Sequence, residues 1–162
     1  MVRLRFLAAF AFSALLASCL NPVHDDAVDA LGPEINGTRP GPRHRAGQPC
    51  LVCHGGLGPG SPEMSVGGTV YLARGGTEAA SDVAVLLTDA KGATRTLTSN
   101  DVGNFYVWKS DWDPAFPLSV SVSRESDHQK MESVIGRDGA CATCHRGQGD
   151  ATHMPAVFLR SR

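Results

Sequence analysis

The clearest pattern in the chain is an alternation of apolar and polar residues through its middle part. Residues 118–123 read Leu-Ser-Val-Ser-Val-Ser, and residues 83–88 alternate in a similar way. Successive side chains of a β-strand face opposite sides of the sheet, so this period of two predicts strands with one buried face. Turn sequences at 89–92 and 99–104 separate these strands. The expected fold class is therefore mainly β, with a small antiparallel sandwich over residues 66–124.

Further strands are expected at 69–72, 94–98 and 105–108, where β-branched and aromatic residues gather. The apolar members of the alternating segments predict the buried face of the sandwich. These predicted core residues are Val83, Val85, Leu87, Phe105, Val107, Leu118, Val120 and Val122.

The N-terminus has a different pattern. Arg3 and Arg5 precede an apolar run that ends in Leu-Ala-Ser-Cys at residues 16–19. This layout predicts a secretory signal peptide over 1–18, since the run is too short for a transmembrane helix. The ending resembles a bacterial lipobox, which implies cleavage before Cys19 and lipidation of that cysteine. The alternative is an ordinary signal peptide with an incidental cysteine.

By the usual sorting tendency, Leu rather than Asp at position 20 favours the outer membrane. We therefore expect an exported outer-membrane lipoprotein that faces the periplasm or the cell surface. Residues 19–49 are rich in proline and glycine, which predicts an extended, mobile tether. Within this tether, the sequence allows one short helical turn near residues 25–31.

The remaining cysteines fall into two identical motifs. Cys50 and Cys53 are followed by His54, and Cys141 and Cys144 are followed by His145. The pattern Cys-x-x-Cys-His is the attachment signature of haem c. Two thiols at this spacing reach the two vinyl groups of one porphyrin, and the adjacent histidine is the proximal iron ligand. The sequence therefore predicts two covalently bound haem c groups.

Three competing interpretations of these cysteines remain. The two pairs could form one zinc site with four thiolates, although that leaves both histidines unexplained. They could be structural disulfides, which an exported protein permits but which also do not need the histidines. A thioredoxin-like redox pair needs a βαβ context, and neither motif has one.

The motifs divide the rest of the chain. Residues 50–65 form a first haem segment in a glycine-rich, irregular loop, and residues 125–162 form the second. A brief helix is expected before the second motif, and residues 156–159 could return as an edge strand or pack on the haem. The helices of a class I cytochrome c are not expected on this pattern.

The middle of the chain resembles a known family. Gly-Thr-Val-Tyr at 68–71, the strand at 83–87, the turn after it and Gly-Asn-Phe at 103–105 look like a carboxypeptidase regulatory-like domain. The resemblance implies a transthyretin-like β-sandwich that acts as a scaffold without catalytic residues. A sandwich between two haem motifs is also similar to exported multihaem cytochromes.

The sixth ligand of each iron would come from another His or Met. His44 is the first candidate for the first haem, with a plain basic loop as its alternative. Met131 is the first candidate for the second haem, because a methionine commonly precedes the motif in the cytochromes that this segment resembles. Lower-ranked candidates are His128, His153 and Met154, while Met64 is unranked and His24 is expected to be a solvated side chain.

Composition sets limits on function. The net charge is −1, so no basic field is available to bind nucleic acid. We expect a cytochrome that transfers electrons between periplasmic or cell-surface redox proteins. Two alternatives are a small haem enzyme of the peroxidase or nitrogen-oxide reductase type, which needs a five-coordinate iron, and a structural haem module that self-assembles into larger electron-conducting complexes.

Overall fold

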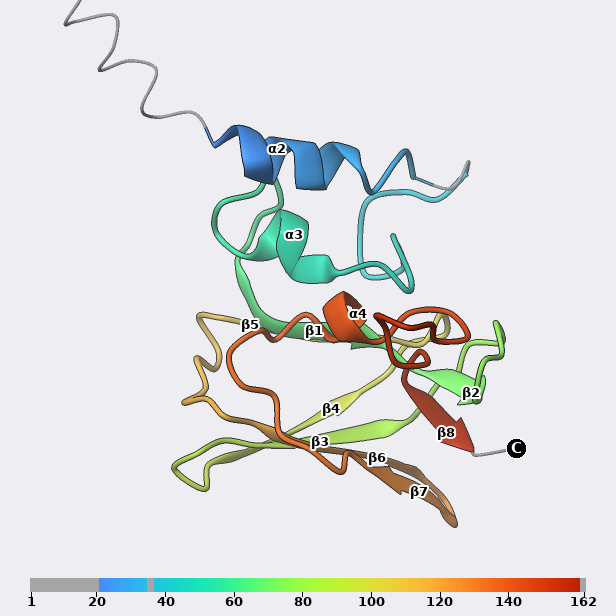
Figure 1. The fold of residues 1–162 in the computed structure, drawn as a ribbon. Coiled ribbons are helices and arrows are strands. Elements are labelled where there is room, and N and C mark those ends of the chain that lie inside the picture. Colours follow the sequence, from blue (N-terminus) through green and yellow to red (C-terminus); the bar gives the residue numbers. More distant parts are fainter. Residues whose placement is uncertain (1–20, 35–36, 161–162) are drawn as a thin grey trace, which may run out of the picture.

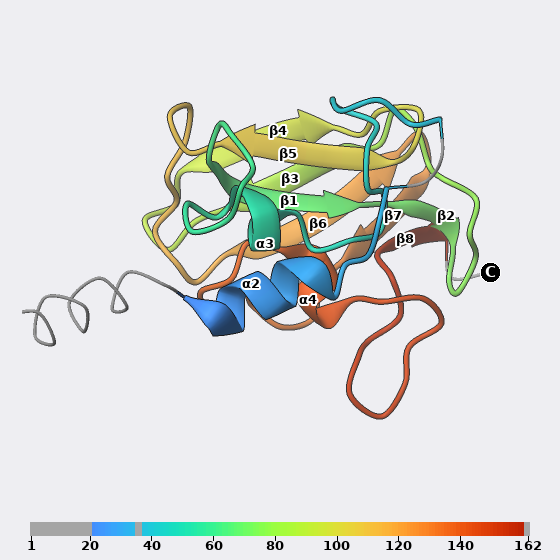
Figure 2. The same ribbon diagram turned by 90° about the horizontal axis from the view of Figure 1, so that it is seen from above.

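The computed structural model describes residues 21–34 and 37–160 (Figure 1). The predicted signal peptide and the lipidation site at Cys19 lie outside these residues. Among the described residues, no helix is both long enough and apolar enough to cross a lipid bilayer. The strands form two layers, and helices α2, α3 and α4 lie together on the outer side of one layer, as Figure 2 shows from above.

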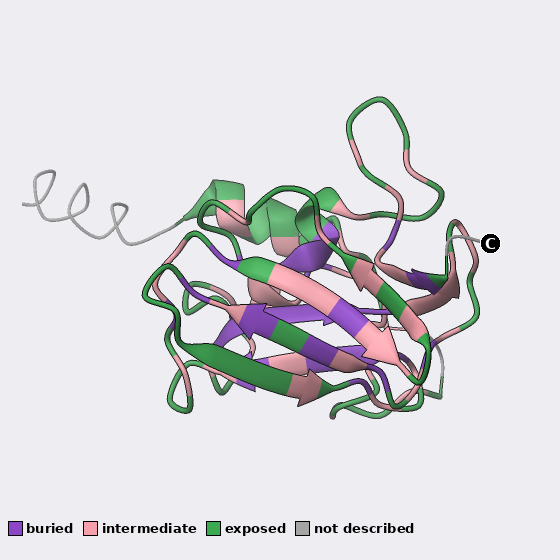
Figure 3. Ribbon diagram, turned by 90° about the horizontal axis from the view of Figure 1, so that it is seen from below, coloured by how far each residue is buried: buried purple, intermediate pink, exposed green. Residues whose placement is uncertain are grey.

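The layer farther from the helices is a four-stranded antiparallel sheet. Its strand order is β4 (Thr94–Thr98), β3 (Ala84–Thr88), β6 (Ser119–Arg124) and β7 (Asp127–Lys130). The register places Val85 opposite Val122 and Leu87 opposite Val120, so the apolar positions of neighbouring strands share one face. Figure 3 shows the resulting alternation of buried and exposed residues along this sheet.

The layer under the helices consists of two strand pairs. Strand β1 (Met64–Thr69) runs antiparallel to β5 (Asn104–Trp108), and β2 (Tyr71–Ala73) runs parallel to β8 (Phe158–Arg160). Every residue of β1 is buried, because α3 and α4 pack on this strand and the core lies on its other side. Strand β1 therefore connects the sandwich to the two cysteine motifs.

The core between the layers confirms the prediction of a mainly β sandwich. Of the predicted core residues, seven are buried and Val120 is partly buried against the same cluster. Four of the predicted strands correspond closely to β3, β4, β5 and β6. The segment predicted at 156–159 contributes to the short edge strand β8.

The segment before the second motif differs from the prediction. The sequence favours a brief helix after residue 125, but residues 127–130 form β7 instead. Arg124 pairs with Asp127 across a two-residue turn, and Glu125 in this turn has φ 55°. Such tight hairpin turns need a positive φ, and a polar strand suits the edge of a sheet.

The short helical turn that the sequence allows near residues 25–31 corresponds to a helix, whereas the rest of the predicted tether differs from the prediction where it is described. Helix α2 (Pro22–Asp29) begins after Asn21, whose side chain accepts a hydrogen bond from the backbone of His24. Residues 37–49 then pack on the sandwich. The side-chain amide of Asn104 donates to the carbonyls of Pro42 and His44, at 3.2 and 3.1 Å. The local sequence could not show this, because the hydrogen bonds join residues about sixty positions apart.

Candidate functional site

Each cysteine motif forms one short helical turn. Helix α3 (Cys50–His54) and helix α4 (Cys141–Cys144) both begin after a residue in extended conformation, Pro49 at φ −73°, ψ 96° and Ala140 at φ −81°, ψ 95°. Residues three positions apart lie on the same side of a helical turn, so each turn brings its two thiols together. The two motifs are thus alike in local structure as well as in sequence.

Both turns lie against β1. If Gly67 carried a Cβ atom, it would lie 3.0 Å from Cβ and 3.1 Å from Sγ of Cys50. The corresponding position on Gly68 would lie 2.8 Å from Cβ and 3.0 Å from Sγ of Cys141. The first cysteine of each motif therefore occupies the space that a side chain would take on β1.

The histidines of the two motifs are held in the same way. Nδ1 of His54 lies 2.9 Å from the carbonyl oxygen of Pro62, and Nδ1 of His145 lies 2.7 Å from that of Pro155. A carbonyl oxygen only accepts hydrogen bonds, so each Nδ1 carries the proton and each Nε2 has a free lone pair. Histidines that bind a metal in proteins show this arrangement. The motif histidines therefore fit the proximal ligand of a haem.

The thiols are buried to different degrees. Cys141 is buried, Cys144 is exposed, and Cys50 and Cys53 are intermediate. Burial raises the pKa of the Cys50 thiol, and burial together with the nearby Cys50 raises the pKa of Cys141 to about 12. Burial thus keeps the thiols of Cys50 and Cys141 in their neutral, protonated form.

The arrangement of the cysteines also bears on the zinc and disulfide interpretations. Within the described part of the chain, no three His, Cys, Asp or Glu side chains converge as a metal site would require. The four thiols of the motifs are free rather than joined in disulfides. A haem thioether needs neither convergence of the two pairs nor an S–S bond, and it uses the histidines.

A cleft adjoins the first motif. It encloses about 390 Å³ and its lining includes Cys50, Cys53 and His54, a volume typical of cofactor pockets. The aromatic ring of Trp108 forms part of the wall, with its centroid 6.2 Å from that of His54. Gly60 leaves room behind the His54 ring, since a Cβ there would lie 2.8 Å from it.

His44, predicted as a ligand of the first haem, lines the same cleft. Its ring centroid is 5.9 Å from that of His54. The Nδ1 atom of His44 accepts a hydrogen bond from the backbone of Gly41 at 3.1 Å. Binding of iron through Nε2 would move the proton to Nδ1, which requires this contact to open.

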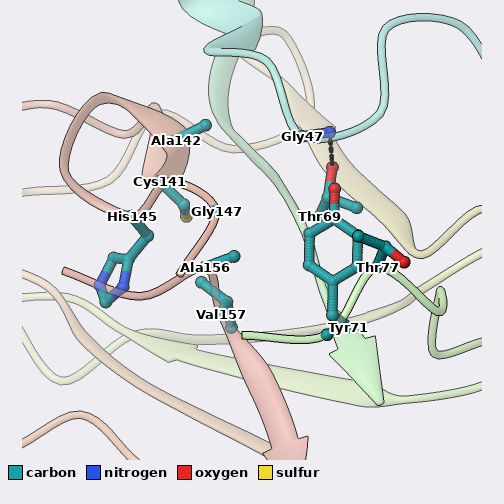
Figure 4. Close-up of a pocket in the computed structure, with 11 residues that line it drawn as sticks. Gly47, Thr69, Tyr71, Thr77, Cys141, Ala142, His145, Gly147, Ala156 and Val157 are labelled. Carbon is teal, nitrogen blue, oxygen red and sulfur yellow. Dashed lines mark hydrogen bonds between the residues drawn. The ribbon is translucent and has the colours of Figure 1, made fainter. Parts of the chain in front are cut away.

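A smaller cavity of about 150 Å³ adjoins the second motif (Figure 4). Cys141 and His145 stand on one side, and Tyr71 and Thr77 stand on the other. The volume is too small to enclose a porphyrin, and Cys144, the second thiol of the motif, is exposed and does not line the cavity. Burial raises the pKa of Tyr71, which keeps its hydroxyl protonated at neutral pH.

The remaining predicted ligands of the second haem lie outside both cavities. His128 is exposed on β7, and the backbone of Met131 donates to the carbonyl of Val120 in the four-stranded sheet. The ring of His153 contacts Asp150 at 3.1 Å. Met154 is joined to His145 by a parallel backbone bridge.

The structure corrects the prediction for His24 and shows where the unranked candidate Met64 lies. The Nε2 atom of His24 is buried, and among the described residues it has no hydrogen-bond partner, although a solvated side chain was expected. Met64 is buried and lines the cleft of the first motif.

Sequence reasoning missed two parts of the site. Gly67 and Gly68 carry a readable signal, because glycine inside a strand often marks the close approach of another chain segment. The carbonyl acceptors of Pro62 and Pro155 carry none, since every residue type has a backbone carbonyl and could supply that oxygen.

Comparisons of the chain with family models, with curated proteins and with solved structures found no match. The resemblance of residues 66–124 to carboxypeptidase regulatory-like domains therefore stays a prediction. The function is therefore inferred from the residues of the site.

Proposed function

We propose that the protein is an exported dihaem cytochrome c that carries electrons between periplasmic or cell-surface redox proteins. A lipid on Cys19 would anchor it to the outer membrane. One observation carries the proposal: both motif histidines are oriented by a proline carbonyl with Nε2 left free, beside paired thiols. A four-thiolate zinc site or a pair of disulfides would leave both histidines without a role.

The residues of the motifs have separate tasks in this proposal. Each cysteine adds its S–H across one porphyrin vinyl group: a C–S bond forms, the thiol proton moves to the terminal carbon, and no oxidant or reductant is consumed. His54 and His145 bind iron through Nε2. The carbonyls of Pro62 and Pro155 fix the rings and raise the basicity of the imidazoles. When bound, the iron supplies a one-electron redox couple.

For the first haem we propose His44 as the sixth ligand, because it shares the cleft with His54. With both axial positions filled by protein, such an iron exchanges electrons without binding substrate. For the second haem, Met131 stays the first prediction from sequence, with His128, His153 and Met154 behind it.

The proposal is tested by expressing the chain in a host that attaches haem c and measuring haem by the pyridine haemochrome assay. We expect two haems per chain, full reduction by a small donor, and full reoxidation in spectroelectrochemistry. The variant Cys53→Ala/His54→Ala should retain one haem. Fewer than two haems in the unaltered protein would contradict the proposal.

The smaller cavity favours a second candidate function at the second haem. Its lining includes the hydroxyl-bearing Tyr71 and Thr77, and His145 is the only His or Met among the described residues that line it. A five-coordinate iron with polar groups nearby is what a small haem enzyme needs. Rapid binding of carbon monoxide or cyanide that Tyr71→Phe alters would support this candidate. If the protein binds neither carbon monoxide nor cyanide, protein side chains fill both axial positions of the second iron. The protein then acts in electron transfer alone.

A further inference from the structure

The two consecutive glycines of β1 bring the motifs together. Gly67 faces Cys50 and Gly68 faces Cys141, each within about a van der Waals contact of where a Cβ would be. Consecutive Cα atoms lie about 3.8 Å apart, and α3 and α4 lie together on the outer side of this layer. The thiol of Cys141 also lies near that of Cys50, so the first cysteine of each motif is anchored at nearly the same point of β1.

The backbone fixes this arrangement on the side of the second motif. The N–H of Gly67 donates to the carbonyl of Gly139 at 3.0 Å, and Ala140 pairs with Gly67 in a parallel bridge. A side chain on Gly139 would collide with the carbonyl of Ser65. The chain that leads into Cys141 thus runs along the free edge of β1 and leaves little room for displacement.

We propose that Gly67 and Gly68 form a shared seat that holds the two haems side by side as one electronically coupled pair. This inference depends on the proposed function, since it presumes haem on both motifs. One thioether of each haem is fixed at this seat, so the near edges of both porphyrins start from adjacent points. Electron tunnelling falls steeply with distance, and such a pair exchanges electrons within the chain before either haem meets a partner.

Circular dichroism in the Soret band tests the seat directly, because two haems in close contact give a bisignate signal that isolated haems lack. The single-haem variants Cys50→Ala/Cys53→Ala and Cys141→Ala/Cys144→Ala provide the reference spectra. We expect the unaltered protein to show a couplet that is absent from the sum of these two spectra. A protein with two haems whose spectrum equals that sum contradicts the shared seat and leaves the proposed function intact. A protein without haem contradicts the proposed function itself.

Glycine variants test the role of β1 in the same protein. In Gly68→Ala the new Cβ would lie under 3 Å from both Cys141 and Phe105, so we expect loss of most of the couplet. Gly67→Ala faces contacts of 3.0 to 3.1 Å and should lose less. Gly136→Ala is the matched control, because nothing lies within 4 Å of its Cβ position, and it should keep the full couplet. The couplet is compared per haem, and only in variants that retain both haems. An unchanged couplet in Gly68→Ala would contradict the shared seat.

Discussion

At the scale of single residues, the histidines distinguish the site from a pair of ordinary cysteine motifs. His54 is almost fully buried and His145 partly so, yet both donate Nδ1–H to a proline carbonyl at hydrogen-bonding distance. The sequence predicts the cysteines and histidines of the motifs as haem-binding residues and His44 as a candidate ligand, and these stay predictions. The acceptors at Pro62 and Pro155 were not predicted, because a backbone carbonyl has no sequence signature.

His44 allows a residue-scale prediction about the first iron. Replacement His44→Ala should remove one axial ligand and convert one of the two haems from low spin to high spin. Electron paramagnetic resonance of the oxidised protein measures this change. His128→Ala is the control, because His128 lies on the exposed edge strand β7, outside the cleft. If His24→Ala gives the spin change and His44→Ala does not, the ligand is the imidazole on α2.

Asp89 gives a prediction about pH. Burial would raise the pKa of its carboxyl group, but hydrogen bonds from the backbone of Ala115, Ala93 and Lys91 outweigh burial and lower it. A carboxyl with a lowered pKa in the folded state stabilises the fold above its unfolded pKa of about 3.9. This contribution is lost as the pH falls through the folded value.

The variant Asp89→Asn should therefore lose stability at neutral pH and show a smaller further decrease below about pH 4. Urea unfolding over a pH series measures both effects. The exposed Asp26→Asn serves as the control and should follow the unaltered protein. Parallel pH profiles for Asp89→Asn and the unaltered protein would contradict this assignment.

At the scale of elements, strands with a period of two or with gathered β-branched and aromatic residues were predicted, whereas β7, which has neither, was not. Strand β6 alternates valine with serine, and its register with β3 follows from burying the valines. Strand β7 has no apolar alternation and pairs only because a tight turn returns it along β6. The convergence of α3 and α4 on β1 joins distant parts of the chain, and local patterns contain no information about such contacts.

Two neighbouring leucines on β3 test the register. Leu87 is fully buried, whereas Leu86 is 40% exposed on the opposite face. Leu87→Ala should lower the free energy of unfolding by about 2–5 kcal/mol. Leu86→Ala should change it by less than about 1 kcal/mol. Denaturant titration of the two variants measures both values, and a register shifted by one residue would reverse their order.

At the scale of the whole molecule, the sandwich is a scaffold with both motifs on one strand. The helices lie together above β1, and the segment predicted as a tether packs against β5 where it is described. The folded part of the protein therefore begins no later than α2, and any lipid anchor lies before it in the chain. With a lipid on Cys19, as proposed, the two cysteine motifs would lie nearer to the membrane than a free segment of residues 19–49 would allow.

The proposed anchor is tested on the full chain in a bacterial host. Cys19→Ser should still be exported but should move from the membrane fraction to the soluble fraction, because the lipidated residue is removed. Cell fractionation with immunoblotting measures the distribution, and Ser18→Ala serves as the control because it leaves a small residue at that position. Equal membrane association of Cys19→Ser and the unaltered protein would contradict lipidation at this cysteine.

The central claim is that both motifs hold covalently attached haem. Intact-mass spectrometry under denaturing conditions tests it most directly, because thioethers survive unfolding whereas bound zinc does not, and each disulfide removes two hydrogen atoms. The account predicts a mass equal to the processed chain plus two haem groups. A chain of unmodified mass, or one lighter by the hydrogens of two disulfides, would contradict it.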